Sequence, residues 1–324
     1  MTSSYERDLG STVAGGAALP TVGESHEAGR SLVYESGLEV EVRSQWTYAR
    51  RRFFRHRLAV ISLVVLILIL GAGAFAPWVA PYSFEGYDIN SIQQAPSWHH
   101  PFGTDLLGRD YLSRVIYGIR TSERVAFIVA CMVVLIGTLV GMVAGYFGGW
   151  VDNVLMRLTD LILTLPGLAV LLTAAAFLGH GSMYRVAIIL SLLLWTALAR
   201  LVRGNFLSLR EKEYVDAAKA AGAGDLRIMF RHMLPNSLGP IIVSGTLTLG
   251  LAIILEAALS FLGFGVLPPT PALGKLIADG QDVSQHAWWL VTFPGLTIVL
   301  IVLCVNFIGD GLRDALDPTQ RIRA

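Results

Sequence analysis

Residues Leu58 to Ala80 read LAVISLVVLILILGAGAFAPWVA, an apolar run without a charged side chain. About 20 such residues form a helix long enough to cross the roughly 30 Å hydrocarbon core of a bilayer. The run begins too deep in the chain for a cleaved signal peptide, and no small-residue cleavage pattern follows it. The sequence therefore predicts an all-α, polytopic membrane protein with six transmembrane helices, because five later runs reach a similar length: Val125 to Phe147, Leu158 to Leu178, Val186 to Val202, Leu238 to Leu262 and Trp288 to Ile308.

The composition agrees with a membrane protein and excludes a nucleic-acid binder. Hydrophobic residues make up 54% of the chain and charged residues 15%, with a mean hydropathy of +0.58. The net charge is only +1, from 25 basic and 24 acidic residues, so the chain lacks the positive field that holds a polyanion. Cys131 and Cys304 both lie inside apolar runs. We therefore expect lipid-facing or packing cysteines, and neither a disulfide framework nor a thiolate metal site.

Basic residues next to the spans predict their orientation. Five arginines lie between residues 50 and 57, directly before the first span, which places the N-terminus in the cytoplasm. Six crossings return the C-terminus to the same side. The predicted outer segment Pro81 to Ser122 also holds Arg109, Arg114 and Arg120, but the charge rule weakens for long loops. Two further stretches support the cytoplasmic assignment: Arg203, Arg210, Lys212, Lys219, Arg227 and Arg231 between the fourth and fifth spans, and Arg313, Arg321 and Arg323 after the sixth.

The chain divides into three predicted regions. Residues 1–45 are rich in Ser, Gly, Thr and acids and predict a disordered cytoplasmic tail, although the alternation from Leu38 could form a short strand or docking segment. Residues 46–121 comprise the first transmembrane helix, its basic flank and an outer segment. Residues 122–324 form the core domain, with five transmembrane helices and a cytoplasmic loop at about 204–236.

Glycines and prolines mark special positions inside the spans. Gly137, Gly141 and Gly145 follow a small-xxx-small pattern that places them on one helical face, where a neighbouring backbone can approach closely. We expect that face to be a helix–helix contact, within the chain or with a second subunit. Pro166 and Pro294 interrupt the third and sixth spans and predict kinks there.

Ionisable residues inside the spans are sparse, and Glu256 is the main candidate for a path or gate. At about 1.5 Å per residue it lies about 27 Å from Leu238, near the outer boundary of the bilayer. The alternative is a solvated or paired carboxylate at that boundary. Asp160, Arg200 and Asp310 lie nearer to span ends. This pattern disfavours an ion-coupled secondary transporter, which would need several intramembrane acids in a relay.

The segment between the fourth and fifth spans predicts two short cytoplasmic helices. The first is Ala-rich, with Glu211, Glu213 and Asp216 near its start and Gly222 and Gly224 beyond its end. The second runs from about Asp225 to Met233 and is expected to stop ahead of Pro235. Ala217, Ala218, Ala221 and Gly222 leave one face of the first helix nearly free of side chains, so that it can enter a groove of another protein.

Several motifs resemble a known family. Asp216-Ala217-Ala218 followed by Gly222 and by Leu234-Pro235 resembles the EAA motif of membrane subunits of prokaryotic ABC importers. Asp216 stands where that motif usually has Glu, and His232 replaces a branched apolar residue. From Gln45 to the C-terminus the chain resembles the second, C-type permease of the dipeptide/oligopeptide/nickel family, through HPFGTDLLGRDYLSR at 100–114, EYVDAAK at 213–219, RHMLPN at 231–236 and GDGLRDALDP at 309–318.

The resemblance implies the transmembrane fold of a type I ABC importer in the bacterial cytoplasmic membrane. It implies as partners a homologous B-type permease, two cytoplasmic ATPase subunits and an extracytoplasmic binding protein that delivers peptide. ATP and Mg would bind to the ATPases, because this chain lacks a Gly-x-x-x-x-Gly-Lys-Ser/Thr loop. It also implies an ATPase-coupling role for Glu213, Tyr214, Asp216, Ala217, Ala218, Ala221, Gly222, Leu234 and Pro235.

Other functions remain as alternatives. The same machinery could carry nickel or glutathione, and no residue identifies the cargo. A nickel-ligand role for His99 and His100, with His180 and His286, is disfavoured because adjacent histidines do not easily face one metal. We therefore predict no metal site. We also predict no catalytic residue, because the chain has no His-Glu-x-x-His, Gly-x-Ser-x-Gly or Cys-x-x-Cys motif.

Overall fold

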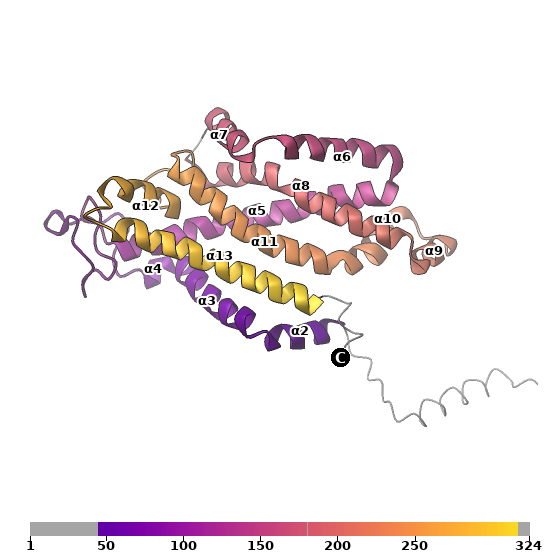
Figure 1. Cartoon of the computed structure of the whole chain (residues 1–324), viewed down its shortest axis with the longest axis horizontal. Helices are drawn as coiled ribbons and strands as arrows, with labels where there is room; N and C mark the ends of the chain where they lie inside the picture. The colour runs from indigo at the N-terminus through magenta and orange to yellow at the C-terminus, as the bar shows by residue number, and fades with distance from the viewer. Residues whose placement is uncertain (1–44, 180, 317–324) are drawn as a thin grey trace, which may run out of the picture. The chain divides into compact units, whose positions relative to one another are not determined.

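The computed structural model describes residues 45–179 and 181–316, which form a helical bundle (Figure 1). Residues 1–44, nearly all of the predicted tail, and the C-terminal arginines Arg321 and Arg323 lie outside the described residues. The helices are α2 (Gln45–Arg55), α3 (Arg57–Ala74), α4 (Ala76–Val79), α5 (Tyr111–Phe147), α6 (Gly149–Thr164), α7 (Gly167–Leu178), α8 (Met183–Arg210), α9 (Glu213–Ala220), α10 (Asp225–Arg227), the π-helix η2 (Ile228–Met233), α11 (Leu234–Phe261), α12 (Leu273–Gly280) and α13 (Trp289–Leu316), with short 3-10 turns at Ile89–Ser91 and Gln281–Val283.

Most of the predicted spans form helices that are long and apolar enough to cross a membrane. In the described part of the chain, five helical stretches are long and apolar enough to cross a membrane: α3, α5, α8, α13 and the stretch from α10 through η2 to α11. A sixth crossing exists only if the bent pair α6 and α7 is one span. The chain is thus an all-α polytopic membrane protein.

The third predicted span is broken rather than kinked. Helices α6 and α7 meet at 90°, with Leu165 and Pro166 extended between them. Proline disfavours the helical conformation of the residue before it, so the helix ends at Thr164. Pro294 behaves differently, because α13 continues through it.

The second predicted span begins earlier than expected. Asp110 accepts a hydrogen bond from the backbone N–H of Ser113 at 2.8 Å and caps α5, which starts at Tyr111. The last third of the predicted outer segment Pro81 to Ser122 is therefore helical and continuous with the second span. Helix α5 also runs without a break across residues 121 and 122, where we placed a region boundary.

The second of the two predicted cytoplasmic helices does not stop before Pro235. Helix α10 passes through η2 directly into α11, and Pro235 lies in the first turn of α11. Proline is tolerated there because the N–H groups of a first turn need no helical partner, and the wider π-turn upstream accommodates the missing bond. The expected helix end was wrong for this reason.

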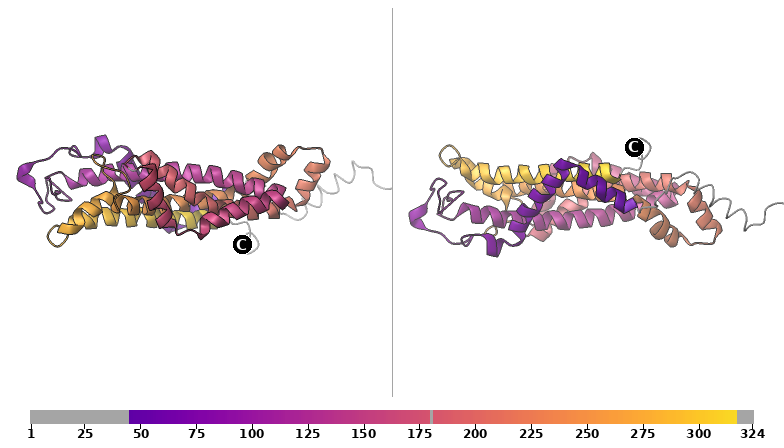
Figure 2. Two further views of the ribbon diagram at one scale, coloured as in Figure 1. Left: turned by 90° about the horizontal axis from the view of Figure 1, so that it is seen from above. Right: turned by 90° about the horizontal axis from the view of Figure 1, so that it is seen from below.

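Helix α5 lies at the centre of the bundle. It packs most extensively on α8, then on α11, while α13 packs on α11 and α3 (Figure 2). Fully buried large side chains fill these contacts, among them Leu198 and Phe206 of α8 and Met142 of α5.

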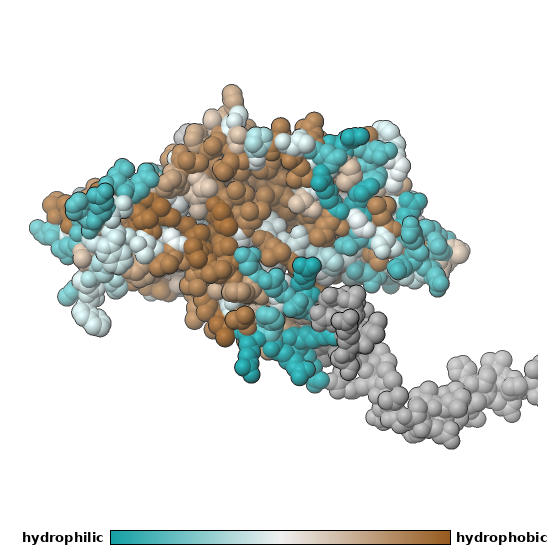
Figure 3. Space-filling model, in the orientation of Figure 1, coloured by the Kyte–Doolittle hydropathy of each residue, from teal (hydrophilic) through white to brown (hydrophobic). Residues whose placement is uncertain are grey.

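Polar and apolar residues separate along the bundle. Apolar side chains form a band across the middle of the helices, with polar residues at both ends (Figure 3). Helices α2 and α9 and the C-terminal end of α13 lie at one end, and α4 and α12 lie at the other (Figure 1). The basic stretches that predicted the cytoplasmic side therefore share one end of the molecule.

Candidate functional site

Helix α9 projects from the end of the bundle where α2 lies (Figure 1). It packs on η2, and among its residues Val215 alone is fully buried. Glu213, Tyr214, Asp216 and Ala217 are exposed and Ala218 is half-buried. The helix is therefore packed on one side and exposed on the other.

Gly222 ends α9 in the manner the sequence predicts. Its φ is +77°, a left-handed conformation that a side chain disfavours. The N–H of Gly222 donates to the carbonyl of Lys219 at 2.9 Å, and the N–H of Ala223 donates to that of Ala218 at 3.0 Å. This pair of bonds is a Schellman motif and turns the chain sharply toward α10.

Exposed apolar side chains lie on α10 and η2, which follow the turn after α9. Leu226 is 69% exposed and Phe230 is 47% exposed. Both follow Asp225, whose carboxylate accepts a hydrogen bond from the hydroxyl of Tyr146, near the end of α5, at 2.6 Å. The loop is thus tied to the central helix of the bundle while its apolar side chains stay available. At the start of α11, Leu234 is half-buried and Pro235 exposed.

The three glycines of α5 face α8. A Cβ added to Gly137 would lie 2.9 Å from the Cβ of Leu198, and one added to Gly145 would lie 2.6 Å from the Cβ of Phe206. At Gly141 it would meet the Val202 Cβ at 2.8 Å and the backbone carbonyl of Ala199. Real Cβ contacts are longer than this, so only glycine permits the close approach of α5 and α8.

Glu256 is buried and hydrogen-bonded rather than solvated, which leaves the paired form of the carboxylate that we considered. The side chain has no exposed surface. Ser122 of α5 donates to one carboxyl oxygen at 2.6 Å, and Ser260 donates to the other at 2.7 Å. The early start of α5 explains the difference, because the first turns of α5 cover the outer part of α11. Glu256 therefore joins two helices and does not line an open path in this conformation.

The motif at residues 100–114 folds into a compact unit at the end opposite α9. Asp105 forms ion pairs with Arg109 and Arg114. The Nε atom of Arg109 lies 2.7 Å from the Asp105 carboxylate. His100 pairs with Asp110 at 2.8 Å, which engages its Nδ1 atom. Burial acts to raise the pKa of Asp105, but the backbone N–H of Arg109 and the Arg114 guanidinium outweigh it and hold that pKa below its usual value.

Two segments that we predicted to lie outside the membrane are held together around this unit. The hydroxyl of Tyr111 donates to the carbonyl of Leu290 at 2.6 Å and to that of Leu276 at 3.2 Å. The indole N–H of Trp289 donates to the carbonyl of Thr104 at 3.2 Å. The end of the bundle opposite α9 is therefore one connected surface made from residues distant in sequence.

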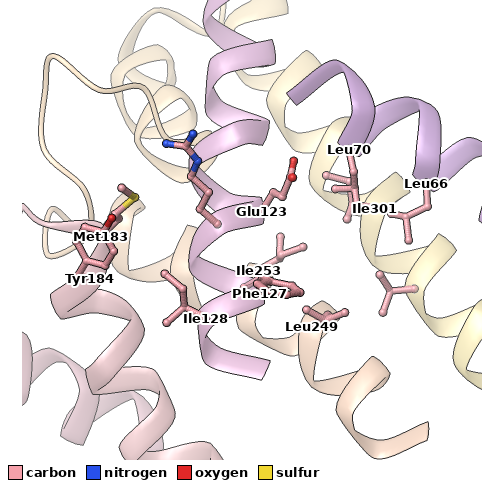
Figure 4. Close-up of a pocket in the computed structure, with 13 residues that line it drawn as sticks. Leu66, Leu70, Glu123, Phe127, Ile128, Met183, Tyr184, Leu249, Ile253 and Ile301 are labelled. Carbon is pink, nitrogen blue, oxygen red and sulfur yellow. The ribbon is translucent and has the colours of Figure 1, made fainter. Parts of the chain in front are cut away.

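A groove of about 440 Å³ opens between the spans (Figure 4). It is lined by residues of α3, α5, α8, α11 and α13, most of them apolar. Two charged residues, Glu123 and Arg124, are part of its wall. Glu123 points into it near Leu70 of α3, while Met183 of α8 lies on the other side of α5 (Figure 4).

The sequence did not single out Glu123 or Arg124, because the second span was expected to begin at Val125. The Asp110 cap was a usable signal: an Asp three residues before a Ser precedes an unbroken helix-compatible stretch. A longer helix would have placed both charges on a spanning helix, where ionisable groups are functional candidates.

Comparison with known proteins places the chain in a family. Residues 137–322 match the binding-protein-dependent transport system inner membrane component, and residues 44–96 match the N-terminal transmembrane domain of oligopeptide transport permease C.

Curated relatives cover most of the chain. A dipeptide transport system permease protein of Alkalihalophilus pseudofirmus is 41% identical over 86% of this chain and 91% of its own length. An oligopeptide transport system permease protein of Haemophilus influenzae is 39% identical over 88% of this chain and 92% of its own. A glutathione transport system permease protein of Pectobacterium atrosepticum is 38% identical over 86% of this chain and 92% of its own. The chain therefore belongs to the family of inner-membrane permease components of binding-protein-dependent ABC transport systems.

Proposed function

We propose that the chain imports peptides across the bacterial cytoplasmic membrane as one half of a permease pair. Its partners are a homologous permease, two cytoplasmic ATPases and an extracytoplasmic binding protein. The observation that carries this proposal is the exposed, alanine-rich face of α9 at one end of the spans. The names of the dipeptide and oligopeptide relatives support peptide as the cargo.

The contacts of α9 suit it to transmit force. When the ATPases close on ATP, they carry the docked α9 with them. Val215 links α9 to η2, which continues into α11, and the Tyr146–Asp225 hydrogen bond links the same loop to α5. A displacement of α9 is thereby passed to two spans, which shift between inward-open and outward-open arrangements.

Nucleotide chemistry belongs to the partners in this proposal. This chain has no phosphate-binding loop of the Gly-x-x-x-x-Gly-Lys-Ser/Thr type. ATP and Mg are held by the ATPases, and this chain needs no cofactor of its own. The shared location of α2, α9 and the end of α13 supports cytoplasmic termini, since all three carry basic residues. The connected outer surface around Asp105 then faces the binding protein.

A bulky side chain on the exposed face of α9 tests the docking role. We expect Ala221→Trp to remain folded in the membrane, because Ala221 is exposed, and to lose ATPase co-purification and peptide-stimulated ATP hydrolysis. Ala176→Trp, on the exposed surface of α7, is the matched control and should keep both. Wild-type ATPase recovery and peptide uptake in Ala221→Trp would refute the docking assignment.

Glutathione is the second candidate cargo, favoured by the 38% identical glutathione permease. Uptake of a labelled tripeptide in the presence of excess glutathione distinguishes a glutathione carrier from a general peptide carrier. Strong competition together with direct glutathione uptake would favour glutathione, and uptake of unrelated peptides without competition would favour a general peptide carrier.

A further inference from the structure

The groove between the spans combines apolar walls with two adjacent opposite charges. Phe127, Leu249 and Ile253 contribute apolar surface, while Glu123 and Arg124 contribute a carboxylate and a guanidinium. Its volume of about 440 Å³ falls within the range of small-molecule sites, about 300–1,000 Å³. The groove can therefore enclose a small ligand that carries charge.

Glu123 and Arg124 form no hydrogen bond or close ion pair with another described residue, although the charges of Arg124 and Arg120 act on Glu123. Arg124 is exposed, and one carboxyl oxygen of Glu123 is buried without a donor. Charged groups on a spanning helix are costly, and those that persist usually meet a ligand, an ion or each other. Glu256, by contrast, has both oxygens satisfied by serines. Of these two carboxylates, only Glu123 keeps a buried oxygen without a donor in the described part of the chain.

Arg120, one turn earlier on α5, adds to the positive side. Its Nε atom is buried and has no hydrogen-bond partner, and its charge acts on Glu123 together with that of Arg124. The wall of the groove therefore offers one carboxylate for a cation and one guanidinium for an anion, with the charge of Arg120 one turn away. A single guanidinium can bind a carboxylate through two parallel hydrogen bonds.

We propose that this groove binds the two charged ends of a short peptide during its passage. Glu123 receives the terminal ammonium group, Arg124 receives the terminal carboxylate, and the apolar wall accepts side chains without selecting among them. This inference rests on the proposed peptide-import function and assigns it a recognition site within the membrane. It makes Glu123 and Arg124 specificity-determining residues for peptides with free termini.

The test pairs changes in the protein with changes in the ligand. The assembled transporter, in nanodiscs without the binding protein, is irradiated with a tripeptide that carries a central benzophenone side chain. Three forms are compared: free termini, N-acetylated and C-amidated. The concentration that gives half-maximal labelling of this chain is measured for wild type, Glu123→Gln and Arg124→Gln. Glu85→Gln and Arg185→Gln are controls, because both residues are exposed and lie outside the groove.

Loss of one charge-assisted bond should raise the half-maximal concentration about tenfold. Glu123→Gln should therefore weaken labelling by the free and amidated peptides and leave the acetylated peptide unchanged. Arg124→Gln should weaken the free and acetylated peptides and leave the amidated one unchanged. Labelling should map to Phe127 or Ile253. The two control variants should match wild type with all three peptides.

Two results overturn the inference. One is equal weakening of all three peptides by Glu123→Gln, since a general structural effect does not distinguish ligand termini. The other is absence of labelling in the groove, while the same preparation supplied with binding protein and ATP still imports peptide. If the wild-type complex imports no peptide at all, the proposed function itself fails.

Discussion

The close contact between α5 and α8 allows a quantitative test. Gly141→Ala places a methyl group 2.8 Å from the Val202 Cβ and against the backbone carbonyl of Ala199. Overpacking of this kind costs about 1–3 kcal/mol, and the upper end applies because a helix backbone cannot move aside locally. Alanine gains about 1 kcal/mol over glycine in helix propensity. The net expectation is a loss of about 2 kcal/mol in the free energy of unfolding.

Gly204→Ala is the matched control. Gly204 lies inside the neighbouring helix α8, and an added Cβ would meet no atom within 4 Å. Only the propensity gain remains, so this variant should be more stable by up to about 1 kcal/mol. The two single-methyl additions should therefore differ by about 3 kcal/mol in opposite directions.

The assay is reversible unfolding of the purified chain in mixed micelles of increasing SDS content, followed by helical circular dichroism. Unchanged or increased stability of Gly141→Ala would refute the argument, since it would mean that α5 and α8 are not in close backbone contact. Equal destabilisation by Gly204→Ala would show that any added methyl group is harmful, and the geometric explanation would fail.

Three further predictions concern single sites. Gly222→Ala should destabilise the end of α9 by about 1–2 kcal/mol through its left-handed backbone alone, seen as faster amide exchange at residues 218–223. Glu256→Gln should change the free energy of unfolding by less than about 1 kcal/mol. Glu256→Ala should lower it by about 3 kcal/mol, because two buried hydroxyls lose their acceptor. Equal changes in the free energy of unfolding for the two variants would contradict the hydrogen-bonded role of Glu256. Because the pKa of Asp105 is lowered in the folded state, its ion pairs contribute stability above its ordinary pKa of 3.8, and this contribution is lost as pH falls through the lower folded value. The backbone amides of residues 103–111 should therefore stay protected from hydrogen exchange down to about pH 4 and lose this protection below it. Loss of protection already at pH 5 would contradict the role of the Asp105 ion pairs.

Features that depend on local sequence could be predicted. The apolar runs located five helices that can span a membrane, because burying backbone polar groups in lipid requires a helix of that length. The end of α9 at Gly222 followed from the conformational freedom of glycine. The motif residues were likewise sufficient to identify the permease family, which the comparisons confirm.

Features that depend on neighbouring elements were missed or misjudged. We expected only a kink at Pro166, because the sequence does not determine the angle between α6 and α7. For Glu256 we considered a path or gate role and a solvated or paired carboxylate at the outer boundary. The sequence could not choose among them, because it does not show that Ser122 of another helix lies beside Glu256.

The sequence by itself determined that this chain is a helical membrane permease, because hydrophobic length and backbone conformation are properties of contiguous residues. Tertiary structure alone decided which charges are satisfied and which are not. Glu256 and Glu123 are both carboxylates on spanning helices, yet one accepts bonds from two serines and the other faces an apolar groove. That difference arises from residues more than a hundred positions apart in the chain, and only the packing of α5 against α11 brings them together.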